Sequence, residues 1–313
     1  MTRFFLLILI FSCNNENLIK DFPTDDNYTV ETTTNASITH TINGKLKAKI
    51  DVGKLERFNK NQIIYLSDGV KLKDVTDDYC VFGIFGPKSR SLMQEISKDN
   101  FSNENFKFSY AKNIKISNLK IWTQRLSYVG ELGYELFVKI SEAKKIYELI
   151  INKGKKFNLS NCGMHALDTM RMESGFLHWG HDISPEENQF QSGLNFTISN
   201  KKEIDFIGKK ALHLIKCKKI NKRFVMLVLK DNKPGLPLLL HDEPIYFKDK
   251  IIGRTTSGNY SFNFKKNLAF GYIKNTYLLE ELLSNDIFIE VEKHMYPAKL
   301  IEKPLKQTNF KKI

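Results

Sequence analysis

Residues 127–136 read SYVGELGYEL, and the interpretation of the whole chain starts from this stretch. Apolar and polar side chains alternate along it, which predicts a β-strand with one apolar face and one face that carries carboxylates. Gly130 and Gly133 flank a single acid, Glu131. Glycine inside a strand indicates a bulge or a close approach by another backbone or a ligand. Glu131 is therefore either a carboxylate placed to accept paired N–H bonds from a flat heterocycle or a solvated acid in a hairpin.

A second stretch, residues 161–182, reads NCGMHALDTMRMESGFLHWGHD and predicts a capped helix followed by an aromatic loop. Asn161 is a good N-cap, and Gly175 is placed to end the helix. Arg171 lies at the side of this helix. The residues predicted for its buried face are Met164, Ala166, Leu167 and Met170.

The last third of the chain has a different sequence pattern, made of short strands and turns. From Arg223 to Ile301, six short apolar runs are separated by turn signals, a spacing that predicts a small antiparallel barrel. The polar and basic segment 216–221 is the predicted linker before it.

The order of these motifs resembles that of the folate-binding aminomethyltransferase family, which includes the glycine-cleavage T-protein. The matching pieces are YVGELGYE at 128–135, MRMESG at 170–175 and GRTTSG at 253–258. Two further pieces, HWGHD at 178–182 and DFIGKKAL at 205–212, are most similar to the carboxyl-terminal half of dimethylglycine and sarcosine dehydrogenases.

This resemblance implies an α+β fold, in which an aminomethyltransferase-like folate-binding domain is followed by a C-terminal antiparallel β-barrel. We expect a leader and loosely ordered segment over residues 1–41. The folate-binding domain, incomplete at its N-terminus, is expected over 42–215, and the barrel over 222–308.

For function, the resemblance implies that tetrahydrofolate captures a one-carbon unit, derived from a small methylated amine, during demethylation of N-methylated glycines. Glu131 would bind the N–H edge of the pterin. The backbone of Gly130 and of Leu132 would lie beside the ring.

The resemblance also suggests roles for three larger side chains. Tyr128 and Trp179 would supply ring contacts to the bound folate. Arg171 would either offer its charge to a carboxylate or form a structural salt bridge with Glu173 or Asp182.

The catalytic residue is unknown from the sequence. The family has a catalytic aspartate in an early glycine-led strand, but the best register puts Ala48 or Lys49 there, with Asp51 nearby. Whether the chain is an enzyme therefore stays open, and the alternative is an inactive relict or a regulatory subunit similar to that of pyruvate dehydrogenase phosphatase. FAD would enter only through a missing or separate flavoprotein part, so a flavoprotein dehydrogenase is a candidate partner.

Composition excludes several other classes of protein and of site. With 42% hydrophobic residues among 313, the chain can bury a substantial core. Its net charge is +13, but the lysines are dispersed, which argues against nucleic acid as a partner. The four cysteines form no CxxC pair, and the HWGHD loop lacks a zinc spacing, so we predict neither a metal site nor a disulfide framework.

The N-terminus allows two interpretations of location. The apolar run from Phe4 to Phe11 is too short to span a bilayer, although with Cys13 it resembles a very short lipoprotein signal peptide. A cytoplasmic or mitochondrial matrix location suits the implied chemistry, and export as a lipoprotein through Cys13 is the alternative.

Overall fold

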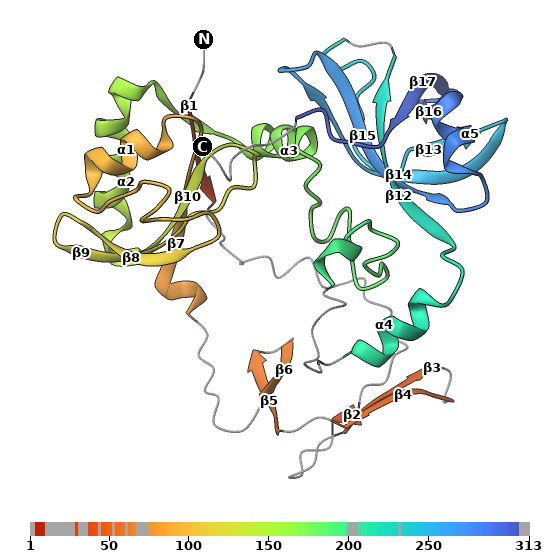
Figure 1. Cartoon of the computed structure of the whole chain (residues 1–313), viewed down its shortest axis with the longest axis horizontal. Helices are drawn as coiled ribbons and strands as arrows, with labels where there is room; N and C mark the ends of the chain where they lie inside the picture. Colours follow the sequence, from red (N-terminus) through yellow and green to blue (C-terminus); the bar gives the residue numbers. More distant parts are fainter. Residues whose placement is uncertain are drawn as a thin grey trace. The chain divides into compact units, whose positions relative to one another are not determined.

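The computed structural model describes residues 75–198, 206, 208–230 and 233–306, together with the backbone of six earlier strands (Figure 1). Those strands are β1 (Phe4–Leu9), β2 (Thr29–Val30), β3 (Ser37–Ile42), β4 (Lys45–Asp51), β5 (Lys54–Asn59) and β6 (Gln62–Leu66). Strands β2, β3 and β4 form an antiparallel sheet, and β5 pairs with β6. Ala48, Lys49 and Asp51 belong to β4, so their side chains lie outside the described residues.

By its backbone contacts the chain divides into two compact units. One comprises residues 1–8, 83–136 and 149–313, and the other comprises residues 9–82 and 137–148. Every residue of the candidate site described below belongs to the first unit.

A mixed sheet organises the first half of the described chain. Its strand order is β11-β1-β7-β10-β9-β8, with β1 parallel to β11 and with β8 antiparallel to β9. The elements in chain order are β7 (Tyr79–Phe85), α1 (Ser89–Ile96), β8 (Ala111–Ile116), β9 (Leu119–Gln124), β10 (Gly133–Lys139), α2 (Ile140–Gly154), β11 (Leu159–Cys162) and α3 (Met164–Glu173). Short 3₁₀ turns lie at Thr76–Asp78, Lys155–Phe157 and Asn195–Thr197.

The alternation predicted for the 127–136 stretch is confirmed where β10 forms. Tyr134, Leu136 and Val138 are buried on one face of the strand. The ring of Tyr134 packs against Phe101 and Phe106 at centroid distances of 5.5 and 5.7 Å. These rings form an aromatic core of the kind that stabilises a small sheet.

The strand itself is shorter than predicted, because β10 begins only at Gly133 and residues 125–132 are irregular. Gly130 has a φ of 65°, which turns the chain out of the extended conformation. The Leu132 carbonyl accepts hydrogen bonds from the Gly86 N–H (2.8 Å) and the Ser89 hydroxyl (3.1 Å). The predicted glycine hinge is thus a turn that precedes the strand.

Gly133 marks the close backbone approach that its place in the strand suggested. A Cβ at this position would lie 2.3 Å from Cδ1 of Phe85 and 2.9 Å from the carbonyl oxygen of Leu126. Any side chain here would therefore displace backbone as well as a buried ring.

The start of helix α3 also differs from prediction. Asn161 does not cap it, because Asn161 belongs to β11 and pairs with Leu6 of β1. The N-cap is Gly163 instead, and Met164, predicted to be buried, is 56% exposed. Leu167 and Met170 are buried as predicted.

The six-stranded barrel predicted at the C-terminus is confirmed. Its strands are β12 (Lys222–Leu229), β13 (Pro244–Phe247), β14 (Lys250–Ser261), β15 (Lys266–Lys274), β16 (Ile287–Val291) and β17 (His294–Ile301). They close in the order β12-β15-β14-β13-β16-β17. Helix α4 (Lys209–Lys216) precedes the barrel, and α5 (Leu279–Ser284) follows β15.

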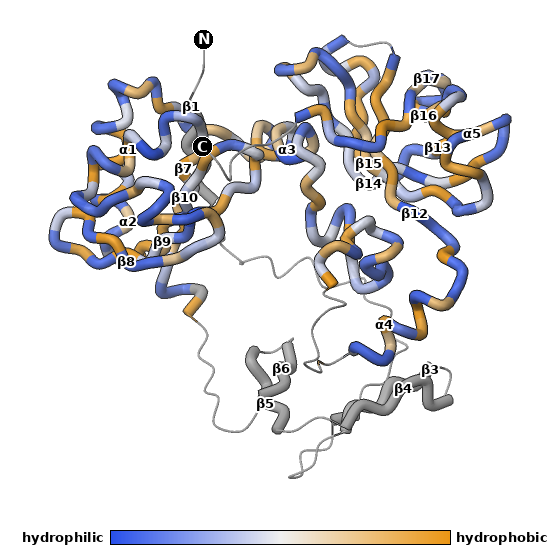
Figure 2. The backbone as a smooth tube through the Cα atoms, in the orientation of Figure 1, coloured by the Kyte–Doolittle hydropathy of each residue, from blue (hydrophilic) through white to orange (hydrophobic). Residues whose placement is uncertain are grey.

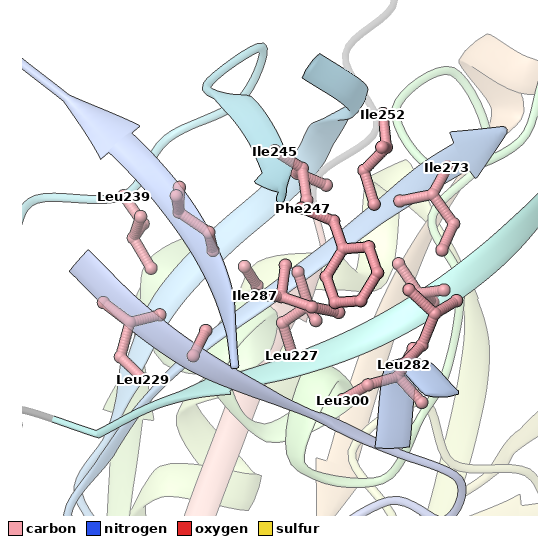
Figure 3. Packing of buried hydrophobic residues seen from close by; sticks show 14 residues of the cluster. Leu227, Leu229, Leu239, Ile245, Phe247, Ile252, Ile273, Leu282, Ile287 and Leu300 are labelled. Atoms are coloured by element: carbon pink, nitrogen blue, oxygen red, sulfur yellow. The ribbon is translucent and has the colours of Figure 1, made fainter. Parts of the chain in front are cut away.

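The barrel is held together by inward-facing apolar side chains. Leu227, Ile245, Phe247, Ile273 and Ile287 point toward one another inside it (Figure 3). Hydrophobic residues, orange in Figure 2, follow one another along much of β12, but their burial alternates, so that Val225, Leu227 and Leu229 face inward. No helix in the described part of the chain is both long and apolar enough to cross a membrane.

Candidate functional site

Helix α3 buries charged side chains near its C-terminal end. Arg171 and Glu173 are 1% and 0% exposed, although the sequence had placed Arg171 at the side of the helix. The helix ends at Glu173 with Ser174 as its C-cap, and Gly175, which has a φ of 73°, turns the chain away after it. Buried charges are rare unless they are paired, so each should have fixed partners.

Arg171 has those partners. Its Nε donates to Oδ1 of Asp168 (2.6 Å), and its Nη1 donates to Oδ2 of Asp182 (2.6 Å) and to the Phe176 carbonyl (2.9 Å). Its Nη2 donates to Oγ of Ser257 on β14 at 2.8 Å. The planar guanidinium thus joins α3, the following loop and a barrel strand.

Asp182 completes this network from the loop. Its Oδ1 accepts hydrogen bonds from the hydroxyls of Thr256 (2.6 Å) and Ser257 (2.8 Å), and its Oδ2 also accepts the His178 N–H (2.9 Å). The predicted salt bridge between Arg171 and Asp182 is therefore present, and Glu173 is not the partner of Arg171. This arrangement supports a structural role for Arg171.

Glu173 forms a second link between α3 and the barrel. Its carboxylate accepts hydrogen bonds from Ser261 Oγ (2.6 Å) and Asn263 Nδ2 (2.8 Å). Its carbonyl accepts the Lys306 N–H at 2.8 Å, which ties the segment after β17 to the end of α3. Leu305 of that segment packs on the buried cluster of Met172, Leu268 and Phe270.

A cavity of about 790 Å³ lies beside these links. Its walls come from residues 127–128, from residues 174–177 after α3, and from barrel strands β12 and β17. Tyr128, Phe176 and Phe224 give it aromatic walls. This volume lies within the range of about 300–1,000 Å³ that is typical of small-molecule sites.

Tyr128 is held firmly in this wall. Its hydroxyl donates to the Leu177 carbonyl at 2.6 Å, and its ring stacks on Phe176 with centroids 6.1 Å apart and planes 13° apart. Burial raises the pKa of Tyr128 to about 12, and the Asp182 charge adds to this effect against that of Arg171. The phenol is therefore a neutral group at physiological pH.

Arg223 brings a positive charge to the same cavity. Its guanidinium donates to the Asn275 side chain and to the Tyr277 carbonyl at 3.5 Å. Glu302 and several serines also line the cavity, and within this mainly apolar wall an arginine suits a ligand that carries a carboxylate.

The other predicted site residues lie elsewhere. Glu131 is not among the residues described as lining this cavity, and it forms an ion pair with Lys306 instead. Its neighbours Gly130 and Leu132 are buried in the turn before β10. Trp179 is 65% exposed and does not line the cavity either. Two of the residues predicted from the sequence bind neighbouring carbonyl groups. The Tyr128 hydroxyl donates to the carbonyl of Leu177, and the Arg171 guanidinium donates to that of Phe176.

The loop that carries Trp179 contains two stacked imidazoles. The rings of His178 and His181 lie 4.6 Å apart, and burial, followed by the charges of His181 and Arg171, lowers the pKa of His178. Within the described ranges, no group of three or more His, Cys, Asp or Glu side chains could hold a metal ion.

Sequence reasoning missed Phe176, Arg223 and Phe224. Phe176 could have been found, because a glycine that ends a helix turns the next residues back across it, and Phe176 follows Gly175 directly. Arg223 and Phe224 carried no such signal. They read only as the first residues of a barrel strand.

Comparison with known proteins identifies the family to which the chain belongs. The family model called GCVT N-terminal domain matches residues 24–202, and that of the Glycine cleavage T-protein C-terminal barrel domain matches residues 222–306. An α+β domain joined to such a barrel defines the aminomethyltransferase class of fold. The chain belongs to the glycine-cleavage T-protein family.

Among its relatives, mitochondrial dimethylglycine dehydrogenase of Homo sapiens is 34% identical over 236 residues, which is 75% of this chain and 27% of the human protein. Mitochondrial sarcosine dehydrogenase of Homo sapiens is 32% identical over 65% of this chain and 22% of its own length. The chain thus spans about a quarter of the length of these relatives. The resemblance and the fold class predicted from the sequence are confirmed.

A solved structure shares the fold. Glycine cleavage system aminomethyltransferase T from Bartonella henselae superposes with a TM-score of 0.64 and 16% sequence identity, over 91% of this chain and 76% of that one. This likeness concerns the fold alone. The predicted domain limits at 1–41, 42–215 and 222–308 stay predictions.

Proposed function

We infer that the chain binds tetrahydrofolate in the 790 Å³ cavity and acts in the transfer of one-carbon units from N-methylated glycines. The observation that carries this proposal is an aromatic cavity, with Tyr128 stacked on Phe176, that is also lined by Arg223. A reduced folate has matching parts, namely a flat heterocycle, an aromatic spacer and a carboxylate tail.

The residues present fit such a ligand. The rings of Tyr128, Phe176 and Phe224 would hold its flat parts and exclude water from them. Arg223 would bind the carboxylate tail through a charge-assisted hydrogen bond. Tetrahydrofolate, when bound, supplies the nitrogen atoms that carry the one-carbon unit. Arg171 and Asp182 would orient the wall of the cavity through Phe176 without touching the ligand.

The proposed pterin contact of Glu131 requires a change at its ion pair. The Glu131 and Lys306 side chains are 23% and 19% exposed, so their pair is only partly shielded from water. A partly exposed pair of this kind is weak enough to be exchanged for paired N–H donors of a ligand. We therefore keep Glu131, with the adjacent backbone of Gly130 and Leu132, as a proposed contact to the pterin, and Trp179 as a proposed ring contact to the bound folate.

The source of the one-carbon unit is proposed by analogy with the relatives. Two of the relatives are named as dehydrogenases of dimethylglycine and of sarcosine, which are both N-methylated glycines. This chain matches about a quarter of the length of each. FAD and the oxidation step would then belong to a flavoprotein dehydrogenase partner.

Isothermal titration with tetrahydrofolate under reducing conditions tests the proposal. We expect saturable binding and a rise in melting temperature, since a ligand selective for the folded state stabilises it. Arg223→Gln should weaken tetrahydrofolate about tenfold but leave a tetrahydropterin without the glutamate tail unaffected. Arg254→Gln, an exposed change outside this cavity, is the matched control. Absence of both heat and thermal shift at saturating ligand would refute the proposal.

One observation bears on the second candidate, a binding or regulatory relative without catalysis. Asp168, Glu173 and Asp182, the acids that anchor α3, are all engaged by hydrogen bonds and do not line the described cavity, where the acid is Glu302. If this candidate holds, tetrahydrofolate should bind while no one-carbon transfer from a methylated glycine is detected, even with a flavoprotein dehydrogenase added.

A further inference from the structure

A second cavity, of about 620 Å³, is not used by the proposed function. It lies on the opposite side of the loop at residues 182–184, because Ile183 lines the first cavity whereas Asp182 and Ser184 line the second. Its remaining walls come from β12, β14 and β15 and from the turn at residues 241–242.

The two walls of this second cavity differ in their balance of charge. The barrel wall contributes the cations Lys222, Arg254 and Lys274 together with the acid Asp242, and the loop wall contributes the acids Glu186 and Glu187 together with Asp182, which is paired with Arg171. A single ion pair between these sets, Lys222 with Glu187 at 2.6 Å, joins the two walls in the described structure.

The other charged side chains of the cavity form weaker ion pairs or none among the described residues. Among the described residues, Arg254 forms an ion pair with Asp242 of its own wall, at 3.3 Å, and is 71% exposed. Within the described part of the chain, the side chains of Lys274 and Glu186 take part in no ion pair. A free cation on one wall thus faces the same space as a free carboxylate on the other.

One residue of the cavity lining also has a buried hydroxyl without a described partner. Tyr272 is 8% exposed and lines the cavity, and among the described groups its hydroxyl has no hydrogen-bond partner. Burial and the charges of Glu187 and Asp182 raise the pKa of Tyr272, so the phenol keeps its proton. Buried polar groups are nearly always satisfied, so this donor indicates a missing acceptor.

We propose that this cavity binds a small zwitterionic molecule of the amino acid class, with its carboxylate toward Lys274 and Arg254 and its ammonium toward Glu186. A simple anion would meet the acidic loop wall, and a simple cation would meet the basic barrel wall, so neither satisfies both. The hydroxyl of Tyr272 would gain a carboxylate oxygen as acceptor. The site is independent of folate binding in the first cavity.

Titration of the whole chain with L-serine, followed by NMR chemical shifts, tests this proposal. Two matched analogues each lack one charge: 3-hydroxypropanoate lacks the ammonium group, and ethanolamine lacks the carboxylate. We expect L-serine to bind at least about tenfold more tightly than either analogue, the effect of one charge-assisted hydrogen bond. Equal affinity for 3-hydroxypropanoate would show an anion site, and no saturable binding of L-serine would show no site. Either result overturns the proposal.

Three variants locate the ligand. Lys274→Gln and Glu186→Gln should each weaken L-serine about tenfold, and Lys250→Gln, an exposed lysine of β14 outside the cavity, should not. Tyr272→Phe should weaken L-serine while leaving the melting temperature of the free protein unchanged or higher, because it removes an unpaired buried hydroxyl. Unchanged affinity in both charge variants would contradict the assignment, whatever Tyr272→Phe does.

Discussion

At the scale of single residues, the ion pair between Arg171 and Asp182 is the contact whose loss should lower stability most. Asp182→Ala would leave the Arg171 guanidinium buried without its main counter-charge. We expect the free energy of unfolding, measured in urea, to fall by about 3–5 kcal/mol.

The matched control for that change is Arg254→Ala. Arg254 is 71% exposed and pairs with Asp242 at 3.3 Å. An exposed pair of this kind contributes about 0–1 kcal/mol, so the control should unfold almost like the parent. Equal effects of the two substitutions would show that the Arg171 network contributes no more to the free energy of unfolding than an exposed ion pair does.

Glu131 allows a test that separates binding from structure. If it accepts paired N–H bonds from the pterin, Glu131→Gln should weaken tetrahydrofolate about tenfold or more. The melting temperature should change little, because the ion pair with Lys306 is partly exposed. Titration calorimetry beside thermal melts measures both.

Lys306→Gln is the control for this test, since it breaks the same ion pair but keeps the carboxylate. Its affinity for tetrahydrofolate should equal or exceed that of the parent. A Glu131→Gln protein that binds as tightly as the parent would remove Glu131 from the site.

Tyr128 predicts a pH dependence at the alkaline end. Its folded pKa of about 12 lies above the ordinary value of 10, so the folded state holds this proton more tightly than the unfolded state. The resulting stability is complete below pH 10 and is lost as the pH rises from 10 toward about 12. Tyr128→Phe should make urea stability less steep in that window, whereas Tyr110→Phe, at an exposed tyrosine, should not.

At the scale of secondary-structure elements, Gly133 fixes where β10 begins. Gly133→Ala would place a methyl group 2.3 Å from Phe85 and 2.9 Å from the Leu126 carbonyl. Overpacking of this kind should lower the free energy of unfolding by about 1–3 kcal/mol.

Gly163→Ala provides the comparison, because a Cβ there meets nothing within 4 Å. Its effect should stay within about 1 kcal/mol. If both substitutions are equally mild in chemical denaturation, the close approach at Gly133 is relieved by simple side-chain movement.

The elements also show how far sequence reasoning reaches. The barrel strands were predictable because short apolar runs are separated by turn signals; which side chains face inward, as Val225, Leu227 and Leu229 of β12 do, was not, because the residues between them are apolar too. The start of α3 was not, because Asn161 is engaged by β1, a pairing distant in sequence that overrides a local capping preference. The burial of Arg171 likewise depends on Asp182 and Ser257, which only the tertiary fold brings to it.

The candidate site was predicted in part for the same reason. Tyr128 and the Arg171–Asp182 pair belong to local motifs that can be recognised in a single sequence. The cavity itself forms where residues near 128, 176 and 224 meet. No local pattern encodes that meeting, so Phe224 and Arg223 could not be predicted.

At the scale of the whole molecule, the segment after β17, residues 302–306, connects the first cavity to α3, and we call it the C-terminal strap. Glu302 and Pro304 line the first cavity, Leu305 covers the Met172 cluster, and the Lys306 N–H binds the Glu173 carbonyl. Truncation after Ile301 should therefore lower the melting temperature and weaken tetrahydrofolate about tenfold or more, because apolar surface and one cavity wall are lost.

Truncation after Lys306 is the control, since it keeps every one of these contacts. Differential scanning calorimetry and folate titration of the two shortened chains would distinguish them. If removal of residues 302–306 has no effect beyond the control, the C-terminal strap contributes nothing to the cavity.

The way α3 is attached to β14 also limits how a ligand can enter and leave. Separation of the helix from the barrel would break the hydrogen bonds of Arg171 to Ser257 and of Glu173 to Ser261 at the same time, so hinge opening between them is a rare event. Exchange should proceed through the loop at residues 183–196, whose residues line the cavity mainly with small and apolar side chains. Hydrogen exchange should accordingly be fast for the amides of that loop and slow for those of α3 and β14, with the dissociation rate of folate following the loop.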